Sequence, residues 1–367
     1  MKYFFSFILG IFINTIYLNA QIISAMQVPG DLSKVHLESK AWLSSDSFSV
    51  TLNRYTQNPF DTKDTLQVQL KALHNGKHVA FLVEWEDDAR DIYPKLSSEG
   101  FVFQLPLETD YENRLPYLYM GDPSQPVIAH IIKKKSEVVY TNIYTDTVFN
   151  DFLVYPNIKS EIRETFTAKH YISKGFGSLE EISSDFLIEM SENKNKKKTL
   201  FVRSLENSIS QISSGVLPIS FFIWQNSNQP RVEKKYISPW IGVKLVGKSG
   251  GGILIDKIEM QSSGDPQNGK ALSLKYCAKC HQFPGGEFAN PKKSPILHNI
   301  GATSTYEYLK NAIVNPNKVI VPNVNDNTIY PWYRVDDSGN KTTLMPSFES
   351  LDDSELEHII SFLQSLK

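Results

Sequence analysis

The segment Cys277-Ala278-Lys279-Cys280-His281 constrains this chain more than any other feature of its sequence. Two thiols at this spacing can add across the vinyl groups of a haem, and the adjacent histidine can ligate the iron. A structural zinc site needs four ligands and a catalytic one at least three, but here Cys277, Cys280 and His281 share one turn and the chain has no second cysteine pair to complete a set. A thioredoxin-type redox pair is the other alternative, but it requires a βαβ context that this region lacks. The segment therefore predicts covalent attachment of one haem c through Cys277 and Cys280.

The residues around this segment predict a small helical domain. Residues 264–272 read as a turn that leads into a helix delivering the two cysteines. Residues 305–314 have a helical apolar spacing that stops before Pro316. Asp352 and Glu355 have the spacing of a capping box at the start of a last helix. The apolar face of that helix consists of Leu356, Ile359, Ile360, Leu363 and Leu366.

Met345 is the only methionine between the cysteines and the last helix. It is a candidate iron ligand, with a core methionine as the alternative and His298 as a rival ligand. His298 lies close behind Pro295, whose carbonyl could accept the ring N–H of His281. Because attachment motif, proline, methionine loop and last helix come in the family's order, residues 262–367 resemble a class I monohaem cytochrome c. The resemblance implies His281 and Met345 as the axial ligands of the haem c iron, a pair that raises the reduction potential.

The N-terminus predicts export. A positive start, an apolar run from Phe4 to Leu18 and a small residue at Ala20 indicate a signal peptide over residues 1–20. The run is shorter than the roughly 20 residues of a spanning helix, although an uncleaved anchor remains an alternative. After cleavage we expect no transmembrane segment, and a location in the periplasm or an equivalent extracytoplasmic compartment. The net charge of −2 gives no reason to expect a nucleic-acid partner.

Residues 21–248 predict a β-sandwich, so the fold class is β plus α in two domains. Apolar and polar residues alternate on both sides of Asn75-Gly76, a dipeptide typical of a tight hairpin turn. A glycine-rich stretch suggests a flexible linker over residues 249–261, which leaves residues 262–367 for the cytochrome c domain. The expected strands cover residues 66–72, 79–85, 101–105, 137–144, 199–202, 219–224 and 240–245.

Several short segments within residues 21–248 resemble the ethylbenzene dehydrogenase haem-binding domain. That family supplies the γ subunits of ethylbenzene, dimethyl sulfide, selenate and chlorate molybdoenzymes, and related subunits of nitrite-oxidising complexes. The resemblance implies a β-sandwich that holds one haem b non-covalently, with methionine and lysine as axial ligands. The segments that carry this resemblance are Ala41-Trp42, residues 76–87, Tyr119 to Pro123 with Pro126-Val127, residues 175–179, Phe221 to Trp224, and Lys235 to Trp240.

The resemblance also indicates which residues would hold haem b. Met120 matches the methionine before Gly-Asp-Pro, and Lys235 matches a recurrent lysine of the family. A ligating lysine must be neutral, so it requires a dry pocket that lowers its pKa. Lys174 and Lys198 remain alternatives. Where the family tends to carry Trp-x-Trp, this chain has His130, which could be structural or an alternative ligand.

These features together predict a dihaem electron-transfer γ subunit rather than an enzyme in its own right. The sequence shows no catalytic triad, phosphate loop or dinucleotide motif, and two six-coordinate irons would have no open position for a substrate. The expected partners are a molybdenum catalytic subunit, an iron–sulfur subunit and other c-type cytochromes. A nitrite-oxidising or nitrate-reducing complex is favoured, while substrate and direction of electron flow depend on the partner. The alternatives are a free-standing periplasmic dihaem shuttle and a haem enzyme such as a peroxidase.

Overall fold

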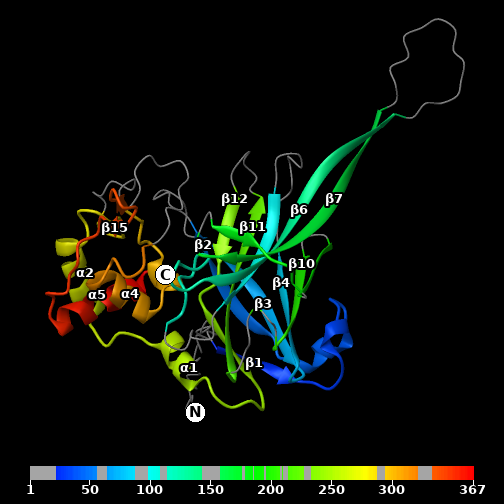
Figure 1. The fold of residues 1–367 in the computed structure, drawn as a ribbon, viewed down its shortest axis with the longest axis horizontal. Helices are drawn as coiled ribbons and strands as arrows, with labels where there is room; N and C mark the ends of the chain where they lie inside the picture. The colour runs from blue at the N-terminus through cyan, green and yellow to red at the C-terminus, as the bar shows by residue number, and fades with distance from the viewer. Residues whose placement is uncertain are drawn as a thin grey trace, which may run out of the picture.

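The structure is a computed structural model in which a mostly β domain is followed by a helical domain (Figure 1). It describes residues 22–55, 64–86, 98–107, 114–142, 158–175, 178–184, 186–193, 196–206, 209, 214–226, 233–286, 294–320 and 333–367. The strands of the β domain are β1 (Ile22–Gln27), β2 (Phe48–Tyr55), β3 (Thr65–His74), β4 (His78–Glu86), β5 (Ser98–Pro106), β6 (Val127–Asn142), β7 (Ile158–Ser173), β8 (Leu179–Glu181), β9 (Leu187–Asn193), β10 (Lys196–Ser204), β11 (Val216–Asn226), β12 (Glu233–Ile237) and β13 (Ile241–Leu245).

These strands pair into one sheet of 13 strands, with the order β8-β7-β6-β5-β11-β12-β2-β3-β4-β10-β9. Strand β1 pairs in parallel with both β13 and β3, and β13 pairs with β11, so the sheet curls back on itself. The strands with alternating burial turn their apolar side chains to the inside, as the period of two residues requires. The predicted β domain is confirmed, and the strands on the two sides of its interior belong to one continuous sheet.

The inside of the curled sheet is rich in aromatic side chains. Phe81, Phe101, Phe103, Phe201 and Phe221 are all at most 1% exposed. The ring centroids of Phe103 and Phe201 are 4.2 Å apart, which brings β5 and β10 face to face across the interior. A buried ion pair between Lys197 Nζ and Glu99 Oε2, 2.6 Å long, joins the same two strands. Packing and charge therefore hold the two halves of the sheet against each other.

The hairpin predicted at Asn75-Gly76 is present between β3 and β4. Gly76 has a φ of 83°, a value that L-residues with a side chain rarely adopt. The Asn75 Oδ1 atom accepts hydrogen bonds from the backbone N–H groups of Lys77 and His78. This turn fixes the register that places Phe81 and Val83 of β4 in the core.

The helical domain follows the predicted pattern. Asp265 caps α2 (Pro266–Tyr276), Thr305 caps α4 (Tyr306–Val314), and Asp352 caps α5 (Asp353–Ser365) by accepting from the N–H of Glu355. The short helix α3 (Ile300–Thr303) and the hairpin of β14 (Tyr333–Val335) and β15 (Lys341–Thr343) complete the domain. The α5 face predicted to be apolar is buried against α2, α3 and α4.

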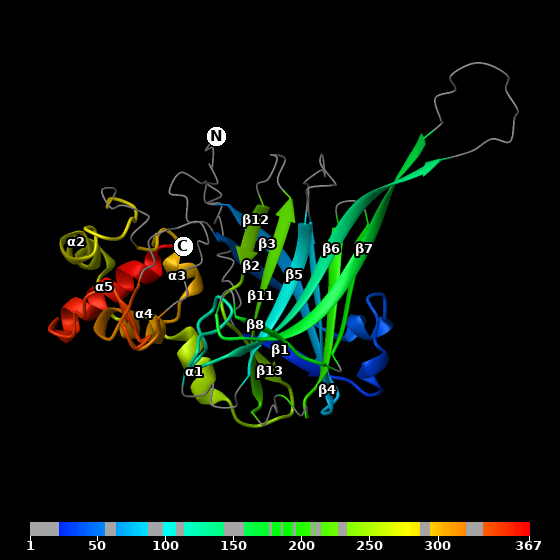
Figure 2. The same ribbon diagram turned by 45° about the horizontal axis from the view of Figure 1, so that its top comes forward.

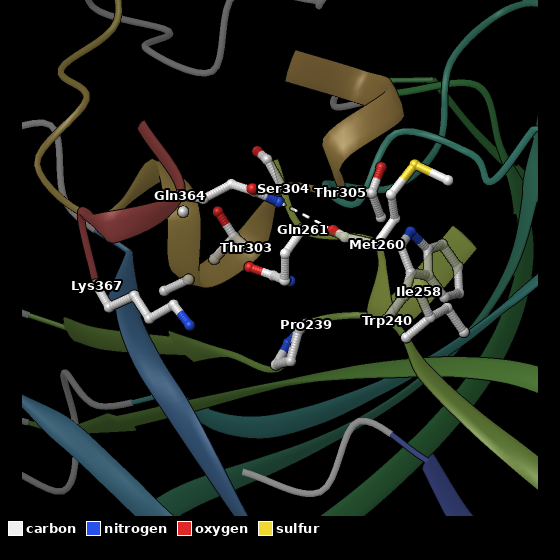
Figure 3. Close-up of a pocket in the computed structure, with 12 residues that line it drawn as sticks. Pro239, Trp240, Ile258, Met260, Gln261, Thr303, Ser304, Thr305, Gln364 and Lys367 are labelled. Carbon is white, nitrogen blue, oxygen red and sulfur yellow. Dashed lines mark hydrogen bonds between the residues drawn. The ribbon is translucent and has the colours of Figure 1, made fainter. Parts of the chain in front are cut away.

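The join between the two domains differs from the expected flexible linker. Gly251 takes a φ of 87° and starts helix α1 (Gly252–Glu259), so the glycine run is a helix boundary. Leu254 and Ile258 of this helix are at most 4% exposed, because they pack on the β domain beside Trp240. Figure 3 shows the segment after α1 between Trp240 and the helical domain, where Gln364 donates to the carbonyl of Met260.

Among the residues that the structure describes, none of the helices has the length and apolar character needed to cross a membrane. The signal peptide predicted over residues 1–20 lies outside the described residues. The same holds for the end of the strand predicted over residues 137–144, whose described part belongs to β6.

We expect Gly269→Ala to destabilise the helical domain. A Cβ at Gly269 would overlap the backbone of His358 in α5, whereas a Cβ at Gly252 would meet no atom within 4 Å. Overpacking should lower the free energy of unfolding by about 2 kcal/mol, despite the higher helix propensity of alanine. Urea unfolding followed by far-ultraviolet circular dichroism measures the change. Gly252→Ala is the matched control and should cost nothing; equal stability of the two variants would contradict this helix contact.

Candidate haem-binding site

A cavity of about 410 Å³ in the helical domain brings together the residues predicted to hold haem c. The end of α2 and the loop before α5 both contribute to its lining. Its walls include Cys277, Cys280, His281 and Met345. The remaining lining residues are mainly apolar or aromatic: Tyr276, Pro295, Tyr308, Ala312, Pro316, Val319, Ile320, Leu344, Pro346 and Phe348. An apolar slot that carries ligands on opposing segments is the environment that a haem requires.

The ring of His281 is oriented as an iron ligand. Its Nδ1 atom lies 2.8 Å from the carbonyl oxygen of Pro295, as the sequence predicted. Since a carbonyl can only accept, Nδ1 carries the proton, and the lone pair of the neutral ring lies on Nε2. Burial lowers the pKa of His281 below its ordinary value, which favours this neutral form. The ring thus offers Nε2 for coordination.

The two cysteines end α2 and begin the turn that leads to His281. The N–H groups of Cys280 and His281 both donate to the carbonyl of Cys277, which closes this turn tightly. Burial raises the pKa of the Cys277 thiol to about 11, so the sulfur is protonated at neutral pH. A protonated thiol is the form whose S and H both add to a vinyl group. The spacing predicted for attachment is therefore matched by the local geometry.

Met345 reaches the cavity from a loop that is bonded to the rest of the domain. Its N–H donates to Thr343 Oγ1, and the N–H of Thr343 donates to the Asn317 side chain. Beyond the methionine, the Ser347 hydroxyl donates to the carbonyl of Val314 at the end of α4. His298, the rival ligand, is half-buried and is not among the residues that line the cavity. The geometry favours Met345 as the partner of His281.

Met120 lies on the β domain, on the outer face of strands β5, β6 and β11. Its side chain is 6% exposed and packs with Val102, Ala129 and Ile131, against which Phe222 and Trp224 also pack. Met120 is the only described non-glycine residue with a positive φ, at 69°. Such backbone strain persists where the surroundings impose it, and it is common at ligand sites. Here two donors fix the Met120 carbonyl, the Ser173 hydroxyl at 2.8 Å and the Gly175 N–H at 2.9 Å.

A buried carboxylate organises the loop that carries Met120. Asp122 is 1% exposed and accepts from both terminal nitrogens of Arg114, at 3.1 and 3.0 Å. It also accepts from the backbone N–H groups of Tyr117, Ser124 and Gln125, and from the Ser124 hydroxyl. Burial raises the pKa of this carboxyl, but the hydrogen bonds from Arg114 and Ser124 outweigh it, so the pKa is lower than usual. The group therefore stays ionised at neutral pH.

Lys235 lies on the same face of the sheet as Met120. It pairs across the strands with Trp224, and directly paired residues of antiparallel strands point to the same side. Trp224 itself packs against the apolar cluster around Met120. Lys235 is exposed, so the described residues do not supply the dry pocket that a neutral lysine needs. The structure thus places both Met120 and Lys235 near Trp224, on one face of the sheet.

The other candidate ligands of haem b are placed differently. Lys198 forms ion pairs with Glu38 and Glu84. The hydrogen bond to Glu38 is the main cause that raises the pKa of Lys198, so the amine stays charged. Lys174 is exposed and lies next to the loop of Met120. His130 is fully buried on the inner face of β6, where it packs against Phe186 and its Nδ1 lies 2.7 Å from Nδ1 of His170. His130 thus faces away from the space next to Met120.

The contacts between the two domains were not foreseen from the sequence. The Tyr119 hydroxyl donates to Thr303 Oγ1, and the Asn299 side chain donates to the carbonyl of Arg54 at 2.7 Å. Figure 3 shows Thr303 close to the strand end at Pro239 and Trp240, around a cavity of about 20 Å³, enough for one water. The cavity that contains His281 and Met345, and the face of the sheet that packs against Met120 (the Met120 face), therefore belong to one packed unit. The only sequence signal was the density of tyrosines around Met120.

The fold and the cavity have the character of a haem-binding domain, and the cavity walls hold the residues that the sequence predicts for thioether attachment and for histidine–methionine ligation. Comparison with protein-family models matches residues 266–367 to the cytochrome c family. This part of the chain is a cytochrome c domain, which implies a covalently bound haem c and electron transfer through it. Cytochrome c domains typically work outside the cytoplasm. No curated protein matches the chain significantly.

Solved structures with some similarity to the chain include carbohydrate binding modules of family 9 from Caldicellulosiruptor kristjanssonii. The module in complex with glucose has 11% identity and a TM-score of 0.30, covering 63% of this chain and 98% of its own. The module in complex with cellotriose has 10% identity and a TM-score of 0.29, covering 63% and 95%. At these scores the likeness carries no argument about this chain.

Replacing both attachment residues, Cys277→Ala with Cys280→Ala, should abolish covalent haem. Without the thiols no thioether bond can form, although His281 and Met345 remain in the cavity. Haem staining after denaturing electrophoresis measures the loss. Lys279→Ala changes the exposed residue between the cysteines and should keep full staining. Staining of the double variant at the level of the unsubstituted protein would contradict the attachment site.

Asp122→Asn should loosen the Met120 loop at neutral pH. Removing one partner of a buried ion pair costs about 3 kcal/mol, while Ser124→Ala should cost only about 1 kcal/mol. Because the pKa of Asp122 is lower in the folded chain, its stabilisation is complete above the ordinary value of 3.8 and is lost as the pH falls through the folded pKa. Urea unfolding between pH 7 and pH 3, roughly, measures both effects. A parallel acid loss of stability in Asp122→Asn would contradict this role.

Proposed function

We propose that this chain is a dihaem electron-transfer subunit that relays electrons between haem b on the β domain and haem c in the cytochrome c domain. In the favoured assignment it is the γ subunit of an exported molybdenum and iron–sulfur oxidoreductase, of nitrite-oxidising or nitrate-reducing type. The iron–sulfur subunit would exchange electrons with haem b, and an external cytochrome would exchange them with haem c. The chain itself then performs no substrate chemistry.

The observation that carries the proposal is the packing of the cytochrome c domain beside the Met120 face. A methionine held in a strained backbone by two hydrogen bonds to its carbonyl is unusual for a core residue. Lys235 and Met120 both neighbour Trp224, which lies against Gly100, where any Cβ would overlap the indole. Glycine at this position lets a flat aromatic group lie against the sheet, beside the predicted ligand pair.

The test of this proposal starts with haem content. Purified protein should contain two haems per chain, one of which is extracted by acidified organic solvent while the other stays covalently bound. Absorption spectra of the reduced protein, with and without carbon monoxide, should show two low-spin haems and no carbon monoxide adduct. A carbon monoxide adduct would instead favour a haem enzyme, and a single covalent haem would refute the haem b site.

Affinity purification of the tagged chain from its native host distinguishes the complex from the alternative, a free-standing dihaem shuttle. Stoichiometric co-purification of molybdenum and iron–sulfur subunits, with nitrite-dependent reduction of an artificial acceptor, would support the favoured assignment. Isolation of a monomer under the same mild conditions would support the shuttle. Activity of the complex on a hydrocarbon or sulfide, without any on nitrite, would contradict the nitrite-oxidising type.

Lys235→Ala should remove one axial ligand of haem b. Haem b should then be lost, or should bind added imidazole, while the covalent haem keeps its spectrum. Lys174→Ala and Lys198→Ala are the controls, since the first lysine is exposed and the second is ion-paired. If His130, Lys174 or Lys198 substitution abolishes haem b while Lys235→Ala does not, the choice of Lys235 is wrong.

A further inference from the structure

The β domain reaches the wall of the haem c cavity at Tyr308. This residue of α4 lines the cavity that also contains His281 and Met345. The ring centroid of Tyr308 lies 5.3 Å from that of Tyr117 in the β domain, and a side-chain hydrogen bond joins the two hydroxyl groups. Tyr308 therefore contacts both the cavity and a residue of the other domain.

Tyr117 is held rigidly by its own domain. Its N–H donates to Asp122 Oδ2, and its carbonyl accepts from the N–H of Gly121. The indole N–H of Trp240 donates to the carbonyl of Pro116, the preceding residue, at 3.0 Å. Figures 1 and 2 show the loop before β6 reaching from the sheet toward the helical domain. Tyr117 is thus a fixed support, because the backbone on both sides of its ring is bonded to the β domain.

The surroundings of the two tyrosines are dry. Burial raises the pKa of Tyr308 well above its usual value, so its phenol is neutral. Tyr119, whose ring centroid lies 5.3 Å from that of Tyr117, is 7% exposed and donates to Thr303 of α3. Tyr117 itself packs against the buried cluster that contains Trp240. Water is therefore excluded on the side of the cavity that Tyr308 lines.

The amount of water around a haem affects its reduction potential. Oxidised iron carries one positive charge more than reduced iron, so nearby water stabilises the oxidised form and lowers the potential. A side chain that keeps its position in the cavity wall excludes this water, whereas one that can turn aside admits it. For Tyr308, the neighbour that fixes the position lies outside the cytochrome c domain.

We infer from this geometry that Tyr117 is a positioning residue for haem c. It holds Tyr308 in the cavity wall, so the β domain contributes to the reduction potential of a haem that is bound in the other domain. The inference concerns haem c alone and goes beyond the proposed function, since it requires no second haem.

Two other roles of the contact between Tyr117 and Tyr308 predict different results. If the contact only docks the domains, loss of any other interdomain bond should change the potential of haem c in the same way. If α4 alone fixes Tyr308, substitution of Tyr117 should leave the potential unchanged.

Spectroelectrochemical titration of haem c in the full-length holoprotein tests the inference. At the midpoint potential of the unsubstituted protein, the ratio of reduced to oxidised haem c should fall about fivefold in Tyr117→Ala, because the gap lets water reach the Tyr308 side of the cavity. Tyr117→Phe keeps the ring and loses the hydrogen bond, so the ratio should fall only about twofold. Circular dichroism and haem staining check that each variant is folded and loaded. If Tyr117→Ala does not fold, Tyr117→Phe decides the outcome alone.

A double-mutant cycle shows whether Tyr117 acts through Tyr308. Tyr308→Leu should lower the potential by itself, because the wall becomes smaller. Tyr117→Ala added to Tyr308→Leu should then change the ratio by less than about twofold, since the side chain to be positioned is absent. A further change as large as that of Tyr117→Ala alone would overturn the inference.

Two controls lose comparable groups away from this contact. Asn299→Ala removes the hydrogen bond to the Arg54 carbonyl, an interdomain contact between residues that do not line the cavity. Tyr306→Phe removes a hydroxyl from the same helix as Tyr308, one that binds Glu357 within the helical domain. Both should leave the potential unchanged. An equal fall in Asn299→Ala and Tyr117→Phe would overturn the inference in favour of docking, and an unchanged potential in both Tyr117 variants would overturn it in favour of α4.

The outcome does not depend on the proposed function. A protein that carries only covalent haem would refute the dihaem proposal, and the potential of that haem would still decide the role of Tyr117. A dihaem protein whose haem c potential does not depend on Tyr117 would refute the inference alone.

Discussion

The ionised carboxylate of Asp122 is the constraint on which the arrangement of this molecule depends. With Arg114 and the surrounding backbone N–H groups it forces residues 114–125 into a compact loop. That loop supplies Tyr119 to the domain boundary and Met120 to the sheet, in adjacent positions. The helical domain contacts the loop through Tyr308 and Thr303, so the loop that this buried charge organises forms part of the boundary between the domains.

The local elements of the fold could be predicted from the sequence because each has a local cause. The Asn75-Gly76 turn, the caps at Asp265 and Asp352, and the apolar face of α5 need only a few neighbouring residues to form. The haem c residues were predictable for the same reason, since the two thiols and the histidine share one turn. Met345 was inferred from order along the chain, and the structure places it in the same cavity as His281.

The features that escaped prediction depend on contacts between distant segments. The parallel pairing of β1 with β13 and β3 closes the sheet, but it leaves no signal in the sequence of β1 itself. The run of glycines before α1 suggested flexibility, whereas Leu254 and Ile258 bury the helix against the sheet. From the sequence alone, Tyr117 and Tyr119 could not be distinguished from the tyrosines of an ordinary aromatic-rich loop, because their partners Tyr308 and Thr303 are distant in the sequence. For Lys235 the sequence offered a family position, and the structure adds only a shared face with Met120.

On the proposed function, Met120 and Met345 would be iron ligands whose positions are set by the protein backbone. Both thioethers sit on loops whose backbone is bonded to other segments. Ser173 and Gly175 donate to the Met120 carbonyl, and the N–H of Thr343, just before Met345, donates to the Asn317 side chain. A ligand whose position is set by the protein moves little when the iron changes its charge, which lowers the cost of each transfer. The strain at Met120 has the same cause, because the surrounding hydrogen bonds impose a backbone conformation that an unconstrained methionine residue would avoid.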